Sequence, residues 1–276
     1  MGSGLEIVNV SDVGRKRPHN EDSTASNSDI GIFVLADGMG GYKAGEVASA
    51  IAVMTILDDV GTGLKKVPSG SGNGGIGGGF SYHSDLVKKA IDHANSNIYQ
   101  LAQSESDCEG MGTTVVIGLV CGDRISIGNV GDSRLYRLRN NQFEQITKDH
   151  SLIQELIDRG FYTPEEAAEK TPRNLVTRAL GLDAGVEVDI IEDQVLPGDI
   201  YLLCSDGLND MVNDEEIHLT LSKYSANLVR AADELVRMAN SNGGKDNISV
   251  VLVRVKEITA TPGRGGNLQK LFSRFF

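Results

Sequence analysis

The chain of 276 residues has no tryptophan, few aromatic residues and only three cysteines. The cysteines, Cys108, Cys121 and Cys204, are odd in number and form no C-x-x-C pair. This argues against a disulfide framework and against a thiolate metal cage. We therefore expect a protein of a reducing compartment, the cytoplasm.

Basic residues are scarce relative to acidic ones. The sequence has 26 Lys and Arg against 38 Asp and Glu, which gives a formal net charge of −12. An acidic protein repels phosphate backbones and anionic lipid headgroups. Nucleic acid and membrane surfaces are therefore poor candidates for the main partner, and a nuclease is disfavoured.

Long apolar runs are also missing. The longest, residues 47–57, is about half of the ~20 residues that a membrane-spanning helix needs. No charged-then-apolar leader precedes the first strand pattern. We expect no transmembrane segment, and a monomer.

The apolar patterns that are present predict a mixed fold. Segments rich in β-branched residues predict strands at 5–10, 30–36, 113–121, 124–130, 135–139, 186–191, 199–204 and 248–255. Helical spacing predicts helices at 45–60, 84–105, 151–159, 164–169, 214–223 and 226–240. The strands come in hairpin-like pairs, with turns at 121–123 and 197–199. We predict an α+β fold: an antiparallel β-sandwich of two sheets with helices on both faces, in four layers α-β-β-α.

Two segments differ in composition from this single domain of residues 5–257. Residues 61–84 begin with nine glycines in nineteen positions and predict a surface loop. The G-x-G-x-x-G at Gly72, Gly74 and Gly77 lies in this loop and not between a strand and a helix, so we predict no nucleotide site there. Residues 258–276 read as a linker and a short basic amphipathic helix, which is either a docked terminus or a contact for a partner or membrane.

Acidic residues stand at the ends of several predicted strands. Asp37 and Asp206 follow two buried strands, Asp132 follows a third, Asp246 precedes the last, and Glu21 and Asp22 follow the first loop. A single Asp-Gly after a strand is usually only a turn. Several carboxylates buried together share protons or hold a cation. Because the ligands are oxygens and no histidines have zinc spacing, the predicted cation is Mg²⁺ or Mn²⁺.

One arginine lies near the first acidic pair. Arg17 precedes Glu21 and Asp22 by four and five residues. A guanidinium beside metal-binding carboxylates can hold a phosphate with two hydrogen bonds. The alternative is a surface ion pair.

The motifs that carry these residues resemble those of a known family. They are Asp12-x-Gly14-x-x-Arg17-x-x-Asn20-Glu21-Asp22, Ala36-Asp37-Gly38-Met39-Gly40-Gly41, Gly112-Thr113-Thr114, Asn129-Val130-Gly131-Asp132-Ser133-Arg134, Thr147-Lys148-Asp149-His150-Ser151, Cys204-Ser205-Asp206-Gly207-Leu208 and Gly243-Gly244-Lys245-Asp246-Asn247-Ile248-Ser249. In this order, over residues 5–257, the sequence resembles the bacterial type of the PPM family, the metal-dependent serine/threonine protein phosphatases of the type 2C class. The resemblance implies the same β-sandwich, and phosphoproteins as substrates.

The resemblance also implies roles for the acidic residues. Asp37 would bridge two Mn²⁺ or Mg²⁺ ions, the Gly38 carbonyl would join one of them, and Asp206 and Asp246 would complete the other. Glu21 and Asp22 would act largely through bound waters. Asp132 with Asp206 resembles the ligands of a third, weaker ion.

Further roles follow from the same resemblance. Arg17 corresponds to the phosphate-binding arginine. Residues 151–182 correspond to a variable flap beside the active site, where substrate selection is expected. Arg178 has a family counterpart whose role we expect to be structural. From their positions, where sheet hydrogen bonds and ion pairs must be completed, we expect the same of Thr113, Thr114, Ser133 and Arg134.

The implied reaction hydrolyses a phosphate monoester by direct attack of a hydroxide that bridges two metals, with no covalent enzyme intermediate. Eukaryotic members have a histidine, the proposed general acid, where this chain has Met39, which cannot donate a proton. Tyr42 is a reluctant acid, because the ordinary pKa of tyrosine is about 10. We favour a metal-bound water near Asp132 as the donor. His150 either approaches the site or only begins a helix.

The sequence leaves two alternative functions open. The chain could be a switch phosphatase dedicated to an anti-sigma-type regulatory module, with the same chemistry. It could also be a catalytically inert pseudophosphatase that binds phosphoproteins. The presence of Asp37, Asp206, Asp246 and Arg17 argues against the inert form.

Overall fold

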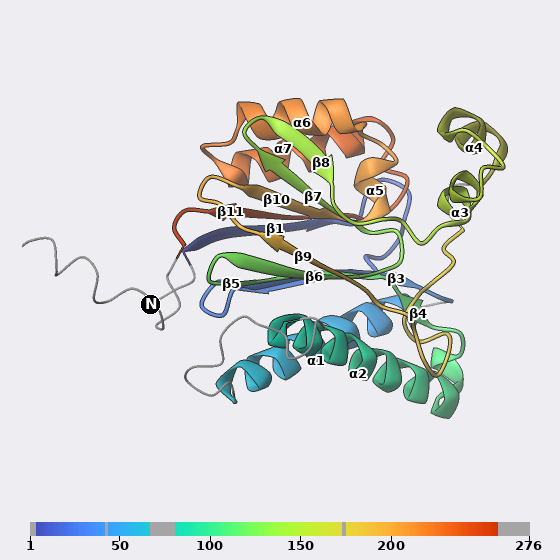
Figure 1. Ribbon diagram of the computed structural model, residues 1–276. Helices are drawn as coiled ribbons and strands as arrows, with labels where there is room; N and C mark the ends of the chain where they lie inside the picture. The colour runs from blue at the N-terminus through green and yellow to red at the C-terminus, as the bar shows by residue number, and fades with distance from the viewer. Residues whose placement is uncertain (1–3, 42–43, 67–80, 173–174, 259–276) are drawn as a thin grey trace, which may run out of the picture.

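The computed structural model describes residues 4–41, 44–66, 81–172 and 175–258. Two antiparallel sheets pack face to face, and a pair of helices covers the outer face of each sheet (Figure 1). The predicted four-layer α-β-β-α architecture is confirmed.

Each sheet is antiparallel throughout. The first has the strand order β1 (Leu5–Asp12), β11 (Ile248–Val255), β10 (Ile200–Cys204), β7 (Arg134–Arg139) and β8 (Gln142–Gln145). The second has the order β2 (Asp22–Asn27), β3 (Ile32–Met39), β5 (Val115–Cys121), β6 (Arg124–Val130) and β9 (Asp189–Gln194), with the short β4 (Gly112–Thr113) paired to β3. The strand pairings fix which strand ends lie together at each end of the sandwich.

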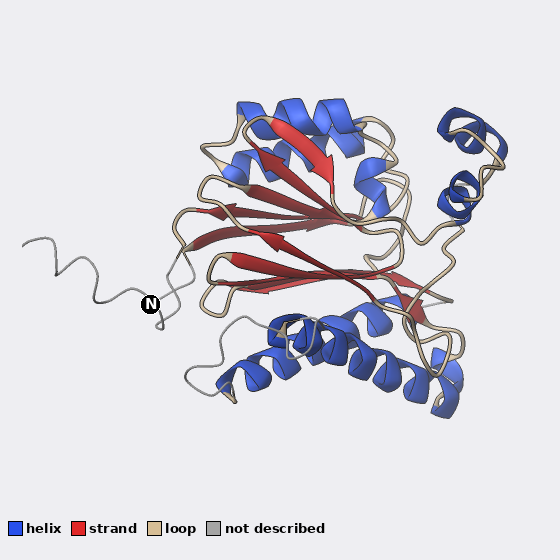
Figure 2. Cartoon of the chain, viewed as in Figure 1, coloured by secondary structure: helices blue, strands red, loops and turns tan. Residues whose placement is uncertain are grey.

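The helices are segregated to the outer faces (Figure 2). The second sheet is covered by α1 (Ala44–Lys65) and α2 (Tyr82–Ser104), and the first by α6 (Asp214–Lys223) and α7 (Leu228–Ser241). The remaining helices are α3 (Leu152–Asp158), α4 (Pro164–Lys170), α5 (Asp206–Asn209) and the short 3-10 helix η1 (Ser106–Cys108).

The alternation of side chains along β3 shows how one strand serves two cores. Ile32 and Val34 point toward α1 and α2, whereas Phe33 and Leu35 enter the layer between the sheets. Successive strand residues face opposite sides, so a strand buried on both faces is apolar throughout. The run before Asp37 is therefore held on both faces, which makes β3 a rigid support for the residue that ends it.

Several predicted boundaries were wrong. The strands β2 and β8 and the helix α5 were missed because their sequences are short or polar. The strand predicted at 186–191 lies instead at Asp189–Gln194. The turn at 197–199 is not a hairpin: β9 pairs with β6 and β10 pairs with β7, so this turn carries the chain from one sheet to the other.

The start of the predicted glycine-rich loop was also wrong. Helix α1 continues through Gly61 and Gly63 to Lys65, because Gly63 lets Leu86 of α2 pack closely against it. Helix α2 begins at Tyr82, inside the range predicted as loop. The rest of the loop at 67–80 and the tail at 259–276 lie outside the described residues.

Helix α1 is, among the described residues, the one helix long and apolar enough to cross a membrane. Its residues Ala48, Ala52 and Ile56 are buried in the core against α2 and the second sheet. It therefore serves as a core helix in this structure.

The pair α3 and α4 stands apart from the four layers, at one end of the sandwich (Figure 1). The segment leaves the body at Ser151 and returns at Val176, and these two residues form a β-bridge with each other. A second bridge joins Leu180 to Thr113. This arrangement fits the expected flap at 151–182, which remains our proposal for the domain organisation.

Candidate active site

Seven of the eight residues predicted to form the site line one cavity of about 200 Å³. They are Arg17, Glu21, Asp37, Gly38, Asp132, Asp206 and Asp246. They come from the ends of β3, β6 and β10, from the start of β11, and from the loop between β1 and β2. Met39, Gly40, Thr114 and Val176 complete the lining, so the return of the flap segment also reaches the cavity.

Asp37 is held on both sides of its peptide by two threonines. Its N–H donates to Thr114 Oγ1 at 3.1 Å, and its carbonyl accepts from Thr113 Oγ1 at 2.8 Å. The Thr114 hydroxyl also lies 2.8 Å from that of Ser133, in the turn that carries Asp132. These three residues have the structural role that we predicted, and they tie two acidic segments together.

Asp22 is the eighth predicted residue, and it lies behind the cavity instead of in its lining. It is opposite Asp37 in the β2–β3 pair, and its Oδ2 accepts from Ser205 Oγ at 2.8 Å. The other oxygen, Asp22 Oδ1, is buried without a hydrogen-bond partner, as is Asp206 Oδ1. Buried carboxylate oxygens without partners are costly unless a proton or a cation satisfies them.

The carboxyl groups strongly perturb one another. Burial raises the pKa of Asp37 well above its ordinary value, and the charges of Asp22 and Asp206 raise it further. Burial also raises the pKa of Asp206, together with the charges of Asp132 and Asp246. For Asp22 and Asp132 burial is again the largest cause, and it raises the pKa of each to about 6. The site therefore favours a positive charge, from protons or from cations.

Side chains alone do not form a complete set of metal ligands in the described site. Among the residues that the structure describes, no three Asp, Glu, His or Cys side chains close around one point. The donors are all oxygens, which fits Mg²⁺ or Mn²⁺, and Mg²⁺ usually keeps several waters. Gly38 also lines the cavity, and only glycine fits there, since a Cβ would lie 2.1 Å from the Gly45 carbonyl oxygen. These residues fit divalent cations whose coordination is completed by a carbonyl and by water.

Arg17 lies in the loop between β1 and β2 and contacts Asp246. One of its nitrogens, Nη2, donates to Asp246 Oδ2 at 2.7 Å, and about half of the side chain is exposed. An arginine has five N–H donors, so most of them stay available for an anion in the cavity. The predicted ion-pair and phosphate-holding roles are thus compatible.

Asn247 is a residue whose importance the sequence did not reveal to us. Its Oδ1 accepts from the N–H of Glu21 at 2.8 Å, and its Nδ2 donates to the carbonyls of Val13 and His19. It thereby fastens the Arg17 loop to the start of β11. Its place next to Asp246 was the available signal.

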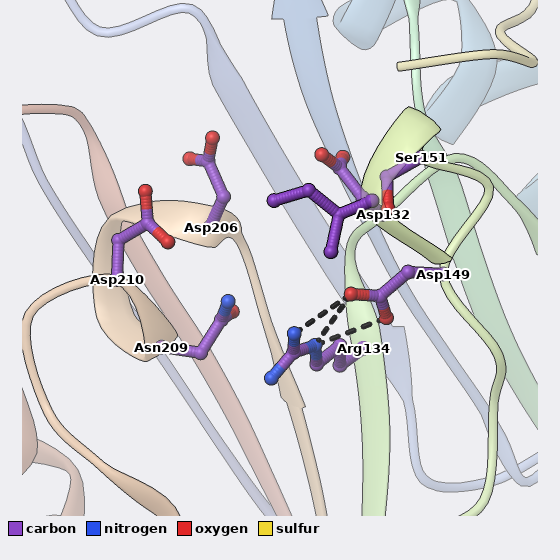
Figure 3. A pocket seen from close by; sticks show the side chains of 8 residues that line it. Asp132, Arg134, Asp149, Ser151, Asp206, Asn209 and Asp210 are labelled. Atoms are coloured by element: carbon purple, nitrogen blue, oxygen red, sulfur yellow. Dashed lines mark hydrogen bonds and ion pairs between the residues drawn. The ribbon is translucent and has the colours of Figure 1, made fainter. Parts of the chain in front are cut away.

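A second cavity of about 170 Å³ adjoins the first and shares Asp132 and Asp206 with it (Figure 3). Its other lining residues are Arg134, Asp149, Ser151, Ile153, Asn209 and Asp210. Arg134 donates to both oxygens of Asp149, which confirms its structural role. Three further acids, Asp132, Asp206 and Asp210, line this cavity.

His150 does more than begin a helix. The backbone N–H of Gly131 donates to the His150 Nδ1 at 3.1 Å, and the backbone N–H of His150 donates to the Gly131 carbonyl. Because Nδ1 accepts, the neutral ring carries its proton on Nε2, which lies 3.2 Å from Asp189 Oδ2. Arg178 binds the other oxygen of Asp189. The buried ring thus fixes the peptide before Asp132 and joins it to the base of the flap segment.

Comparisons with known proteins agree with this geometry. A family model described as Protein phosphatase 2C matches residues 15–252, and the chain belongs to this family. The serine/threonine phosphatase stp of Listeria welshimeri is 40% identical over 245 residues, which cover 88% of this chain and 92% of the relative.

Solved structures show the same fold. The Mycobacterium tuberculosis serine/threonine phosphatase PstP/Ppp superposes with a TM-score of 0.80 at 36% identity, over 92% of this chain and 99% of that chain. A structure of the PstP catalytic domain in complex with two manganese ions gives a TM-score of 0.77 at 37% identity, over the same shares of the two chains. The predicted family is therefore confirmed.

The buried carboxyls predict an unusual pH dependence of stability without divalent cations. The folded protein retains protons on Asp22 and Asp132 up to about pH 6, whereas the unfolded chain releases them near pH 4. Stability from these groups is present below pH 4 and is lost as the pH rises through 6, by about 3 kcal/mol per group at most. Urea unfolding in EDTA at pH 5 and 7.5 tests this.

The Asp22→Asn variant is the control, and its stability should change less between the two pH values. Carboxyls whose pKa is lowered, such as Glu6, lose their stabilisation only at more acidic pH. A wild-type protein more stable at pH 7.5 than at pH 5 in EDTA would contradict the expectation.

The contact between His150 and Gly131 predicts a difference between two substitutions. His150→Leu leaves the buried Gly131 N–H without an acceptor and should lower the free energy of unfolding by about 1–3 kcal/mol. In His150→Asn, Oδ1 takes the place of Nδ1, so the loss should be clearly smaller. Chemical denaturation followed by circular dichroism measures both, and equal losses would show that the acceptor is unimportant.

Proposed function

We propose that this chain is a Mn²⁺- or Mg²⁺-dependent protein phosphatase that hydrolyses phosphoserine and phosphothreonine and opposes serine/threonine kinases in bacterial signalling. The observation that carries the proposal is the convergence of four mutually repelling aspartates and one arginine on a single cavity, in a member of the phosphatase 2C family. Relatives of this chain are named serine/threonine phosphatases, which supports the substrate class.

Each residue of the cavity has a proposed role toward the metals. Asp37 would ligate both ions, the Gly38 carbonyl would ligate one, and Asp206 and Asp246 would ligate the other. Glu21 and Asp22 act through water, in accord with the position of Asp22 behind the cavity. The two manganese ions of the related PstP catalytic domain support this assignment.

A weaker third ion is part of the proposal. Asp132 and Asp206 are the two acids common to both cavities, and Asp206 Oδ1 is buried without a partner. This pair is the proposed site for the additional ion.

When bound, the divalent cations supply an activated water and neutralise the phosphoryl oxygens. Arg17 binds the phosphoryl group with the N–H groups that Asp246 leaves free and orients it for in-line attack. Asp37 is fixed by Thr113 and Thr114, so it holds its position without reorganisation. Met39 lines the cavity and has no proton to give to the leaving alkoxide. Tyr42 lies outside the described residues.

The general phosphatase function is favoured over the alternatives. The relatives named above carry general serine/threonine phosphatase names, not those of dedicated switch enzymes. A pseudophosphatase is disfavoured because the full set of predicted acids converges with Arg17. We further propose that the enzyme acts on phosphoproteins as a monomer in the cytoplasm.

The proposed function predicts metal-dependent hydrolysis of p-nitrophenyl phosphate. Mn²⁺ should restore activity after EDTA treatment, and Asp37→Asn or Asp206→Asn should lower kcat/KM by about 10²-fold or more, since each removes a proposed ligand. Asp107→Asn, which alters an exposed acid, is the matched control. Activity that survives chelation, or full activity of Asp37→Asn, would disprove the proposed site.

The third ion predicts a distinct effect of Asp132→Ala. Turnover of a phosphopeptide should fall about tenfold or more at low Mn²⁺ and recover in part at high Mn²⁺, while the two core ions still bind. Calorimetric titration with Mn²⁺ counts the sites, with Asp107→Ala as the control. Unchanged turnover over a wide Mn²⁺ range would rule out a role for this site.

A further inference from the structure

Most cations of the described residues are engaged, but six are not. Arg15, Lys16, Lys65, Lys66, Lys89 and Lys245 have no ion pair, side-chain hydrogen bond or ring contact within the part of the chain that the structure describes. Every other described Arg or Lys contacts an acid or a ring, as Arg134 contacts Asp149 and Lys223 contacts Tyr224. In an acidic protein, unpaired cations are the exception.

Three of these six gather beside the active-site cavity. The Arg15 N–H donates to the Gly244 carbonyl at 2.7 Å, which joins the loop before β2 to the turn before β11. Lys16 precedes Arg17 in the first segment, and Lys245 precedes Asp246 in the second. All three side chains are exposed. We call Arg15, Lys16 and Lys245 the cationic rim.

Within the described part of the chain, the second cavity adds no unpaired cation to the site. The second cavity shares Asp132 and Asp206 with the first, and its arginine, Arg134, is bound to Asp149 (Figure 3). Among the described residues, a segment that places its phosphorylated residue in the site would therefore meet unpaired cations only at the rim. Positive charge on one side of a site selects and orients acidic ligands.

We propose that the cationic rim binds acidic side chains that flank the phosphorylated residue of the substrate, a preference that rests on the proposed phosphatase function. The rim has no internal partners to lose, so an acidic flank forms ion pairs without breaking others. Exposed charge pairs are individually weak, so the rim acts through the sum of several and is sensitive to salt. It governs substrate capture, and the chemical step depends on the carboxylate site.

The test compares two phosphothreonine peptides on the Mn²⁺-loaded full chain. One carries glutamates on both sides of the phosphorylated residue, and the other carries alanines. At about 50 mM salt the wild type should prefer the acidic peptide by about tenfold in kcat/KM, and the preference should shrink at 0.5 M salt, where the Debye length falls below about 5 Å. Lys16→Glu with Lys245→Glu should abolish or invert the preference.

The matched control is Lys65→Glu with Lys66→Glu. It gives the same change of net charge, and α1 places it about 30 Å from the Ala44 end of the helix, near the site. This variant should keep the preference. The milder pair Lys16→Ala and Lys245→Ala should reduce the preference to about threefold. This pair keeps the test decisive if the charge-reversed protein misfolds.

Two results would overturn the proposal. One is a wild type that hydrolyses both peptides with equal kcat/KM, and the other is an unchanged preference in the rim variants. Failure of the wild type to hydrolyse either peptide or p-nitrophenyl phosphate with Mn²⁺ would instead disprove the proposed function, and the rim proposal would fall with it.

Discussion

Mutual repulsion among buried carboxylates is the constraint on which the site depends. In addition to the effect of burial, Asp22, Asp132 and Asp206 each raise the pKa of Asp37, and Asp22 and Asp132 also raise that of Asp206. No folded protein would hold such a group ionised without compensation. The rest of the structure keeps these groups in place until cations relieve them, so part of the stability of the fold is given up for function.

Small polar side chains hold the segments that carry these acids in place. Thr114, Ser205 and Asn247 each bind two or more chain segments next to a carboxylate. Two sheets supply the acids at one end of the sandwich, and the hydrogen bond from Ser205 to Asp22 joins the two sheets there. The geometry of the site is thus defined by groups that have no chemical step to perform.

Sequence reasoning recovered the four layers and the acidic cluster because both follow from local patterns. The apolar run before Asp37 marks a strand buried on both faces, and Asp-Gly at its end marks the exit. The polar strand β2 had no such pattern, since its pairing with β3 and not its composition makes it a strand. Asn247 and the ring of His150 could not be assigned, because their partners lie more than 18 residues away and are brought close only by the fold.

The β-bridge between Ser151 and Val176 means that the flap segment leaves and rejoins the body at nearly the same point. When the two ends of a segment already lie together, the segment can change in length at little cost, because the entropy of loop closure grows only with the logarithm of its length. Its helices can therefore be exchanged or rebuilt while the acids beneath them stay in register.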